Sequence, residues 1–161
     1  ALVGLLVGCS SSPSHRGSAG RPDRSAAVTA IRKAGTQFES SVQVHPLIDP
    51  AVEGLLHQAR ELEAQGQPAQ ALANVRKALT ITPKAPELLQ YEAELLIETG
   101  DWKQAESRAQ QSYQLGPKVG GLCARSLETL VWTRFALRDD AGVKQAQQQL
   151  AGCRVPDRHR Y

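Results

Sequence analysis

Apolar residues recur at helical spacing through residues 50–150, and residues that start or end helices interrupt them at regular intervals. Proline favours the first turn of a helix, and aspartate caps a helix N-terminus by accepting a backbone hydrogen bond. Four predicted helices begin in this way, at Pro50, Pro68, Pro86 and Asp101. The pattern therefore predicts an all-α protein. Its predicted core is the apolar set Leu55, Leu62, Leu72, Val75, Leu79, Leu89, Leu96 and Leu115.

The same marks return after 34 residues, so the chain contains an internal repeat. Small residues let two antiparallel helices pack closely, and glycine takes the positive φ that ends a helix. A 34-residue period with these marks resembles the tetratricopeptide repeat, a helix–turn–helix unit that stacks into a solenoid. The resemblance implies two repeats over residues 52–117. The paired positions are Ala59 and Ala93, Gly66 and Gly100, Ala71 and Ala105, and Pro83 and Pro117.

A third, altered unit follows the two repeats. Residues 102–105 are echoed by residues 143–146, but the step from Ala105 to Ala146 is 41 residues, seven more than the repeat. Seven residues make about two helical turns, so we expect a longer first helix over residues 118–138. We expect the chain to turn at Asp139-Asp140 into a short last helix that ends near Cys153. The sequence thus predicts a solenoid domain of about three helix pairs over residues 49–153.

The start of the chain has a different character. Residues 1–8 are apolar and uncharged, and they lead into Cys9 and three serines. The run is too short for a membrane-spanning helix, which needs about 20 residues. It resembles the end of a bacterial lipoprotein signal peptide with the lipobox Leu6-Val7-Gly8-Cys9, which implies cleavage before Cys9, lipidation of that cysteine and an outer-membrane anchor facing the periplasm. No Met or basic start precedes the run, so we expect the signal peptide to begin upstream; the alternative is a chance apolar start with a free thiol.

Residues 9–48 are predicted to be a lipid-anchored flexible linker. Its early part is rich in Ser, Gly, Pro and Arg and has no apolar periodicity, which is typical of disorder. Ala27, Ile31, Ala34 and Phe38 follow at steps of four, three and four, which favours one short amphipathic helix over residues 25–38 that packs on the repeats. Residues 154–161 are a basic tail.

The lipoprotein resemblance changes the interpretation of the two remaining cysteines. Disulfides persist in the periplasm, and Cys123 and Cys153 fall near the start of one predicted helix and the end of its antiparallel partner. We therefore predict a disulfide between them, with two buried thiols as the alternative. Their spacing does not fit a zinc site, which needs paired ligands.

Charge and motif content argue against several function classes. The chain has 19 Lys and Arg against 16 Asp and Glu, a net charge of +3, and the repeats themselves are nearly neutral, which does not favour nucleic-acid binding by the folded part. The sequence has no phosphate-binding glycine loop, no zinc-protease motif and no nucleophile elbow. We predict no catalytic residue, no metal and no cofactor.

In tetratricopeptide arrays the first helices of successive repeats line a concave groove. The resemblance places nine residues of this chain there: Glu53, Leu56, Arg60, Glu63, Glu87, Gln90, Glu94, Ile97 and Glu98. Glutamates dominate the set, so we expect an acidic, solvent-facing groove that favours a basic or amphipathic peptide. The alternative is that these glutamates only keep the face soluble.

The combination of lipobox, linker and small repeat domain resembles the LpoP-type outer-membrane lipoproteins of Gram-negative bacteria, which activate a class A penicillin-binding protein. The resemblance implies a non-enzymatic protein that binds this bifunctional peptidoglycan synthase from the outer membrane. The alternative is an adaptor or pilotin for a pilus, secretion or outer-membrane complex. A cell-wall enzyme is a third class, which the missing catalytic motifs disfavour.

Overall fold

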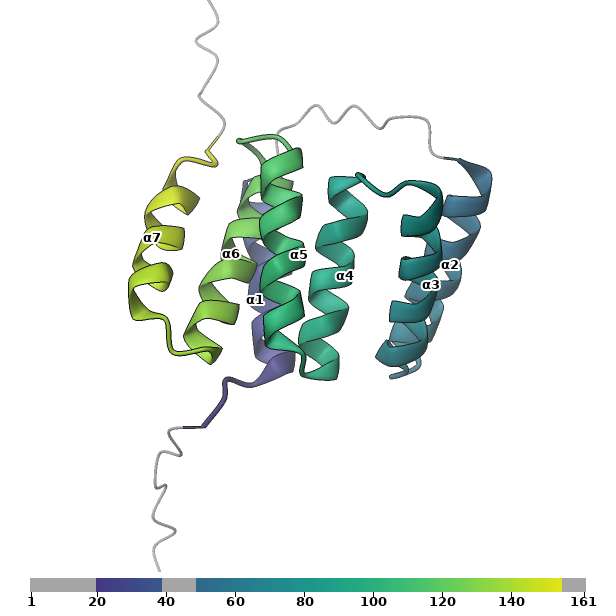
Figure 1. Cartoon of the computed structure of the whole chain (residues 1–161), viewed down its shortest axis with the longest axis horizontal. Helices are drawn as coiled ribbons and strands as arrows, with labels where there is room; N and C mark the ends of the chain where they lie inside the picture. The colour runs from purple at the N-terminus through teal and green to yellow at the C-terminus, as the bar shows by residue number, and fades with distance from the viewer. Residues whose placement is uncertain (1–19, 39–48, 155–161) are drawn as a thin grey trace, which may run out of the picture.

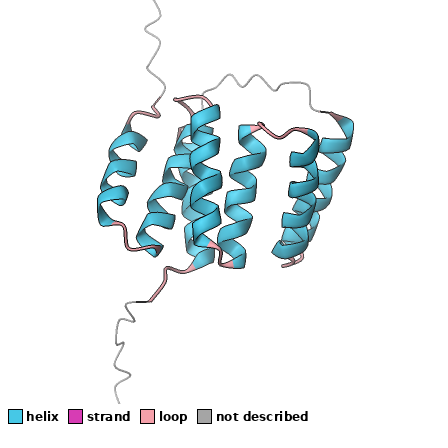
Figure 2. Ribbon diagram, viewed as in Figure 1, coloured by secondary structure: helices cyan, strands magenta, loops and turns pink. Residues whose placement is uncertain are grey.

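A computed structural model describes residues 20–38 and 49–154, and these ranges contain seven α-helices and no strand (Figures 1 and 2). The lipobox, residues 39–48 and the tail beyond Arg154 lie outside the described residues. Within the described part, no helix is both long enough and apolar enough to span a bilayer. The helices are α1 (Arg24–Gln37), α2 (Pro50–Ala64), α3 (Pro68–Ile81), α4 (Pro86–Thr99), α5 (Trp102–Leu115), α6 (Gly121–Ala136) and α7 (Asp140–Ala151).

The helix boundaries follow the local signals of the sequence. Prolines occupy the first position of α2, α3 and α4. Asp101 caps α5 by accepting a hydrogen bond from the Gln104 amide at 3.0 Å. Gly66 and Gly100 follow α2 and α4 with φ angles of 73° and 92°, the left-handed conformation that ends a helix at low cost only for glycine.

Three antiparallel hairpins, α2–α3, α4–α5 and α6–α7, stand side by side (Figure 1). The small repeat residues let the paired helices pack closely, and Ala59, Ala71, Ala93 and Ala105 are all fully buried. The prediction that Leu115 belongs to the core is wrong. Leu115 is 50% exposed, because it is the last residue of α5 and lies at the rim of the stack. The other predicted core residues are buried or half-buried, namely Leu55, Leu62, Leu72, Val75, Leu79, Leu89 and Leu96.

The third repeat differs from the prediction in where its seven extra residues lie. We expected all of them in its first helix, but α6 is only two residues longer than α4 and starts at Gly121. The two loops that flank α6 are each one residue longer than their counterparts, and α7 holds three more residues before Ala146 than α5 holds before Ala105. The late start of α6 follows from Gly120, whose φ of 86° is incompatible with a helix.

The helix α1 packs against α4 and α6, on the face that the first helices of the second and third repeats form. Figure 1 shows it behind this part of the stack. Ala27, Ile31 and Ala34 are buried at the contact, and Phe38 is half-buried just beyond the helix. The short helix expected over residues 25–38, inside the predicted linker, is therefore α1, and it packs on the repeat stack as expected.

A disulfide joins Cys123, in the first turn of α6, to Cys153, two residues beyond α7, with 5.7 Å between the Cα atoms. Both residues are buried. The Gly120 amide donates a hydrogen bond to the Cys153 carbonyl at 2.7 Å, so the backbone also closes this end of the hairpin.

Candidate functional site

The central helix α4 carries two fully buried carboxylates on opposite faces. Glu92 faces the second helices of the repeats, where Arg76 Nε of α3 lies 2.9 Å from its Oε1 and Arg108 Nε of α5 lies 2.8 Å from its Oε2. Because α4 lies in the middle of the stack, with neighbours on both sides, these two carboxylates are removed from water and need cationic partners.

Glu94 occupies the other face of α4, toward α1 and α6. Arg32 Nε of α1 donates to Glu94 Oε2 at 2.9 Å, and Arg125 Nε of α6 donates to Glu94 Oε1 at 2.9 Å. The sequence analysis wrongly placed Gln90, Glu94 and Ile97 in a solvent-facing groove. All three are 0% exposed, because α1 and α6 pack over this side of α4.

The groove that remains open lies between α2 on one side and α1 and α4 on the other. No Cα atom of α2 comes within 8 Å of a Cα atom of α1 or α4. One ion pair crosses this gap, between Arg32 Nη2 and Glu63 Oε1 at 2.6 Å. The space beside the bridge forms two hollows of about 580 and 330 Å³.

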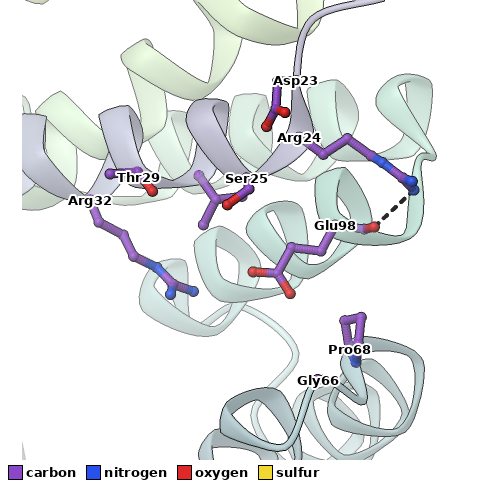
Figure 3. Close-up of a pocket in the computed structure, with 9 residues that line it drawn as sticks. Asp23, Arg24, Ser25, Thr29, Arg32, Gly66, Pro68 and Glu98 are labelled. Atoms are coloured by element: carbon purple, nitrogen blue, oxygen red, sulfur yellow. Dashed lines mark hydrogen bonds between the residues drawn. The ribbon is translucent and has the colours of Figure 1, made fainter.

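The larger space, which we call the Glu98 hollow, lies between the first turns of α1 and the turn from α2 to α3 (Figure 3). Arg24 donates to the Glu98 backbone carbonyl at 3.0 Å and ties α1 to the end of α4. The Glu98 carboxylate extends toward the Arg32 guanidinium. The hollow is lined by Asp23, Arg24, Ser25, Val28, Thr29, Arg32, Gly66, Pro68 and Glu98.

The smaller space, the Arg60 hollow, is lined by side chains of α1, α2, α4 and α6. Leu56 and Leu88 are buried beneath it, and the exposed Arg60 and Glu87 stand on its α2 and α4 walls. The lining residues are Arg32, Leu56, Arg60, Glu63, Glu87, Leu88, Tyr91 and Arg125.

The polar groups at the bridge perturb one another. Burial alone would raise the pKa of Glu63, but hydrogen bonds from Tyr91 and Arg32 together with the Arg32 charge hold that pKa below its usual value. Burial and the neighbouring Glu63 carboxylate raise the pKa of Glu98 to about 7. Burial and the Glu63 carboxylate likewise raise the pKa of Tyr91. At neutral pH Glu63 is therefore charged, whereas Glu98 holds its proton to a higher pH than an ordinary glutamate does.

Five of the nine predicted groove residues line the hollows, namely Leu56, Arg60, Glu63, Glu87 and Glu98. Glu53 is exposed but lines neither. Sequence reasoning missed the cations Arg32 and Arg125, which α1 and α6 bring into the groove. The groove is therefore mixed in charge and not simply acidic. The sequence did contain a signal for Arg32. The helical spacing of Ala27, Ile31 and Ala34 predicts that this face of the helix packs on the repeats, and Arg32 lies directly beside that face.

Comparison with known proteins agrees with this architecture. Residues 62–115 match the sequence model of a family described as tetratricopeptide repeat. The helical domain has a tetratricopeptide-repeat fold. Among solved structures, it is similar to the globular C-terminal domain of P. aeruginosa LpoP, with 27% sequence identity and a TM-score of 0.59, over 65% of this chain and 99% of that chain. No curated protein matches the chain.

The tetratricopeptide-repeat domain offers a binding surface. Four of its glutamates, Glu63, Glu92, Glu94 and Glu106, form ion pairs with arginines of other helices. Within the described ranges no group of three His, Cys, Asp or Glu is placed to hold a metal ion. The fold indicates a protein partner. The open groove supplies the recognisable elements of such a contact, with apolar Leu56 and Leu88 beneath the charged Arg60 and Glu87.

Proposed function

We propose that the chain is a periplasmic lipoprotein, anchored in the outer membrane through Cys9, that binds and activates a class A penicillin-binding protein. The similarity to the C-terminal domain of LpoP, which extends over 99% of that domain, is the observation that carries the proposal. The lipobox and the LpoP-type layout of the sequence support the anchor and the partner. The domain acts as a ligand of the synthase and performs no chemistry of its own.

The groove between α2 and the α1–α4 wall is the contact that we assign to the synthase. A partner shifts an enzyme toward its active state only through its higher affinity for that state. A coupling free energy of about 1–3 kcal/mol corresponds to roughly fivefold to 150-fold activation. Arg60 and Glu87 are suited to a charge-reversal test because both side chains are exposed. Glu94 is unsuited, because it is buried and its loss would disturb the fold.

The test is a glycan polymerisation assay with lipid II, the cognate synthase and the chain. We expect saturating chain to raise the polymerisation rate several-fold. The double variant Arg60→Glu and Glu87→Lys should abolish activation while retaining the helical circular dichroism of the parent. Lys103→Glu, an exposed charge reversal on α5, is the matched control and should activate normally. An unchanged rate, with binding instead to a pilus or secretion component, would move the assignment to the adaptor function.

The anchor has a separate test. Replacing Cys9 with Ala should prevent incorporation of labelled fatty acid and release the protein from the outer-membrane fraction. Recovery of a labelled Cys9→Ala protein in that fraction would contradict the lipidation site.

A further inference from the structure

The first hairpin, α2–α3, is attached to the other described helices along one side. Cα atoms of α3 come within 8 Å of α4, whereas those of α2 come that close only to α3. Because each repeat of a solenoid packs only on its neighbours, the packing of α3 on α4 can act as a hinge. Rotation of the hairpin about this hinge would change the distance between α2 and the wall formed by α1 and α4.

The side chains that cross this space meet at one carboxylate, Glu63 on the last turn of α2. Arg32 of α1 donates to one of its oxygens at 2.6 Å, and the Tyr91 hydroxyl of α4 donates to the other at 2.7 Å. The Glu98 carboxyl group of α4 is also a hydrogen-bond partner of Glu63. Because these partners all lie on the opposite wall, Glu63 fastens the hinged hairpin to the rest of the stack.

One member of this cluster changes charge near neutral pH. Burial and the Glu63 carboxylate raise the pKa of Glu98 to about 7. The pKa of Glu63 is held below its usual value despite burial, and burial together with Glu63 raises the pKa of Tyr91, so neither titrates there. The turn from α2 to α3 contributes only uncharged groups. The charged and titratable groups around Glu98 are Asp23, Arg24 and Arg32 from α1 and its cap, Glu63 from α2, and Tyr91 and Glu94 from α4.

We propose that Glu63 and Glu98 form a pH-sensitive latch, which holds the α2–α3 hairpin against α1 and α4 when Glu98 is protonated and releases the hairpin when Glu98 is ionised. Protonated Glu98 can donate a hydrogen bond to the Glu63 carboxylate. After ionisation, two carboxylates repel each other across the gap. Arg32 already pairs with both Glu63 and Glu94, so it is not free to neutralise a third carboxylate.

The surroundings of Glu98 allow this response. Figure 3 shows its side chain between the first turn of α1 and the turn that holds Gly66 and Pro68, beside a hollow of about 580 Å³. Arg24 donates to the Glu98 backbone carbonyl and not to the carboxylate. Rotation of the hairpin away from α4 would separate the two carboxylates and let water reach Glu98.

The direction of the pH effect follows from linkage. The latched arrangement raises the pKa of Glu98 from 4.5 to about 7, so it binds the proton more tightly than the released arrangement does. The ratio of released to latched molecules therefore rises with pH through this window, by at most about tenfold per pH unit. Release would uncover Leu56 and Leu88, which are buried beneath the Arg60 hollow. The latch is a property of the groove and does not depend on the identity of the partner.

The test measures the distance between α1 and α2 by double electron–electron resonance in the full chain. Spin labels are introduced as non-natural amino acids at the exposed positions Lys33 and Glu61, because the chain has cysteines of its own. Distance distributions are recorded at about pH 5.5 and about pH 8 after rapid freezing. We expect one short distance at the lower pH and a second, longer distance at the higher pH, with the ratio of long to short changing by about tenfold to thirtyfold.

Three variants separate the latch from other pH effects. Glu98→Gln should keep the short distance at both pH values, because its amide can donate to Glu63 without ionising. Glu63→Gln should lose the pH response, because ionised Glu98 then has no charged neighbour on α2 to repel. Glu53→Gln is the matched control on α2: this exposed glutamate lines neither hollow, and its loss should leave the pH response of the parent unchanged.

Equal distance distributions at both pH values, release at the lower pH instead of the higher one, or an unchanged response in Glu98→Gln would each overturn the proposal. Synthase activation is a separate measurement. If polymerisation is raised but the α1–α2 distance does not depend on pH, the proposed function stands and the latch fails. If the distance responds as described but polymerisation is unchanged, the latch stands and the proposed partner is wrong.

Discussion

Glu92 provides a direct test of what holds the stack together. Its carboxylate is fully buried, whereas its two partners, Arg76 and Arg108, have side chains that are 46% and 37% exposed. Removing both arginines strands a buried charge, which costs about 3–5 kcal/mol. Removing the charge instead, with Glu92→Gln, keeps the shape and lets both guanidinium groups turn toward water, so we expect a loss of about 1–2 kcal/mol.

The experiment therefore compares the stability of the double variant Arg76→Met and Arg108→Met with that of the single variant Glu92→Gln. Urea denaturation followed by far-ultraviolet circular dichroism gives the free energy of unfolding. With a slope of about 2 kcal/mol per molar urea, the double arginine variant should lower the midpoint by about 2 M and Glu92→Gln by less than about 1 M. The single variant Arg76→Met should fall between the two, because Arg108 still pairs with the carboxylate.

The triple variant, with Glu92→Met added to the two arginine changes, completes the test. Three apolar side chains of similar length leave no buried charge, so stability should return to within about 1 kcal/mol of the parent. The reasoning is refuted if Glu92→Gln is as damaging as the loss of both arginines, or if the triple variant is no more stable than the double one.

Three further predictions concern single features. Reducing the Cys123–Cys153 disulfide, which spans 30 residues, should lower the free energy of unfolding by about 3–4 kcal/mol, and equal urea midpoints with and without reductant would contradict this. The pKa of Glu98 is raised from 4.5 to about 7, so the fold favours the protonated form of this carboxyl group. The parent therefore loses stability as the pH rises from 4.5 to 7. The Glu98→Gln variant should be as stable as the parent below pH 4.5 and more stable than the parent above pH 7. Gly66→Ala should lower the free energy of unfolding by about 1–2 kcal/mol from backbone strain alone, because φ is 73° and an added Cβ meets no atom within 4 Å; an unchanged midpoint would exclude that strain.

The helices and their order were predictable because local chemistry determines them. Proline at a first turn and aspartate at a cap act within one helical turn, and each appears in the structure at the expected residue. The 34-residue period then predicts which helices are neighbours. The third repeat was less predictable, because a seven-residue insertion can be shared among loops and helices. The start of α6 became clear only from the structure, in which Gly120 has a positive φ that no helix residue adopts, so the helix begins after it.

The content of the groove was not predictable in the same way. The repeat pattern describes helices α2 to α7, whereas α1 lies outside it and fills part of the groove through contacts such as Arg32 with Glu94, 62 residues away. The approach is close, since a Cβ added to Gly35 would lie 2.6 Å from Cγ of Arg125. A residue on the concave face of a solenoid therefore faces solvent only where no additional helix covers it.

The two buried carboxylates also constrain how the repeats stack. Apolar side chains of similar size would tolerate a shift of α4 along its neighbours by one turn, about 5.4 Å. Such a shift would carry Glu92 away from Arg76 and Arg108, and Glu94 away from Arg32 and Arg125. Each stranded charge would cost about 3–5 kcal/mol, comparable in total with the whole stability of a small domain. We infer that these ion pairs select one register of the stack, and that the same register holds Arg32 where it can bridge α4 and α2 across the open groove.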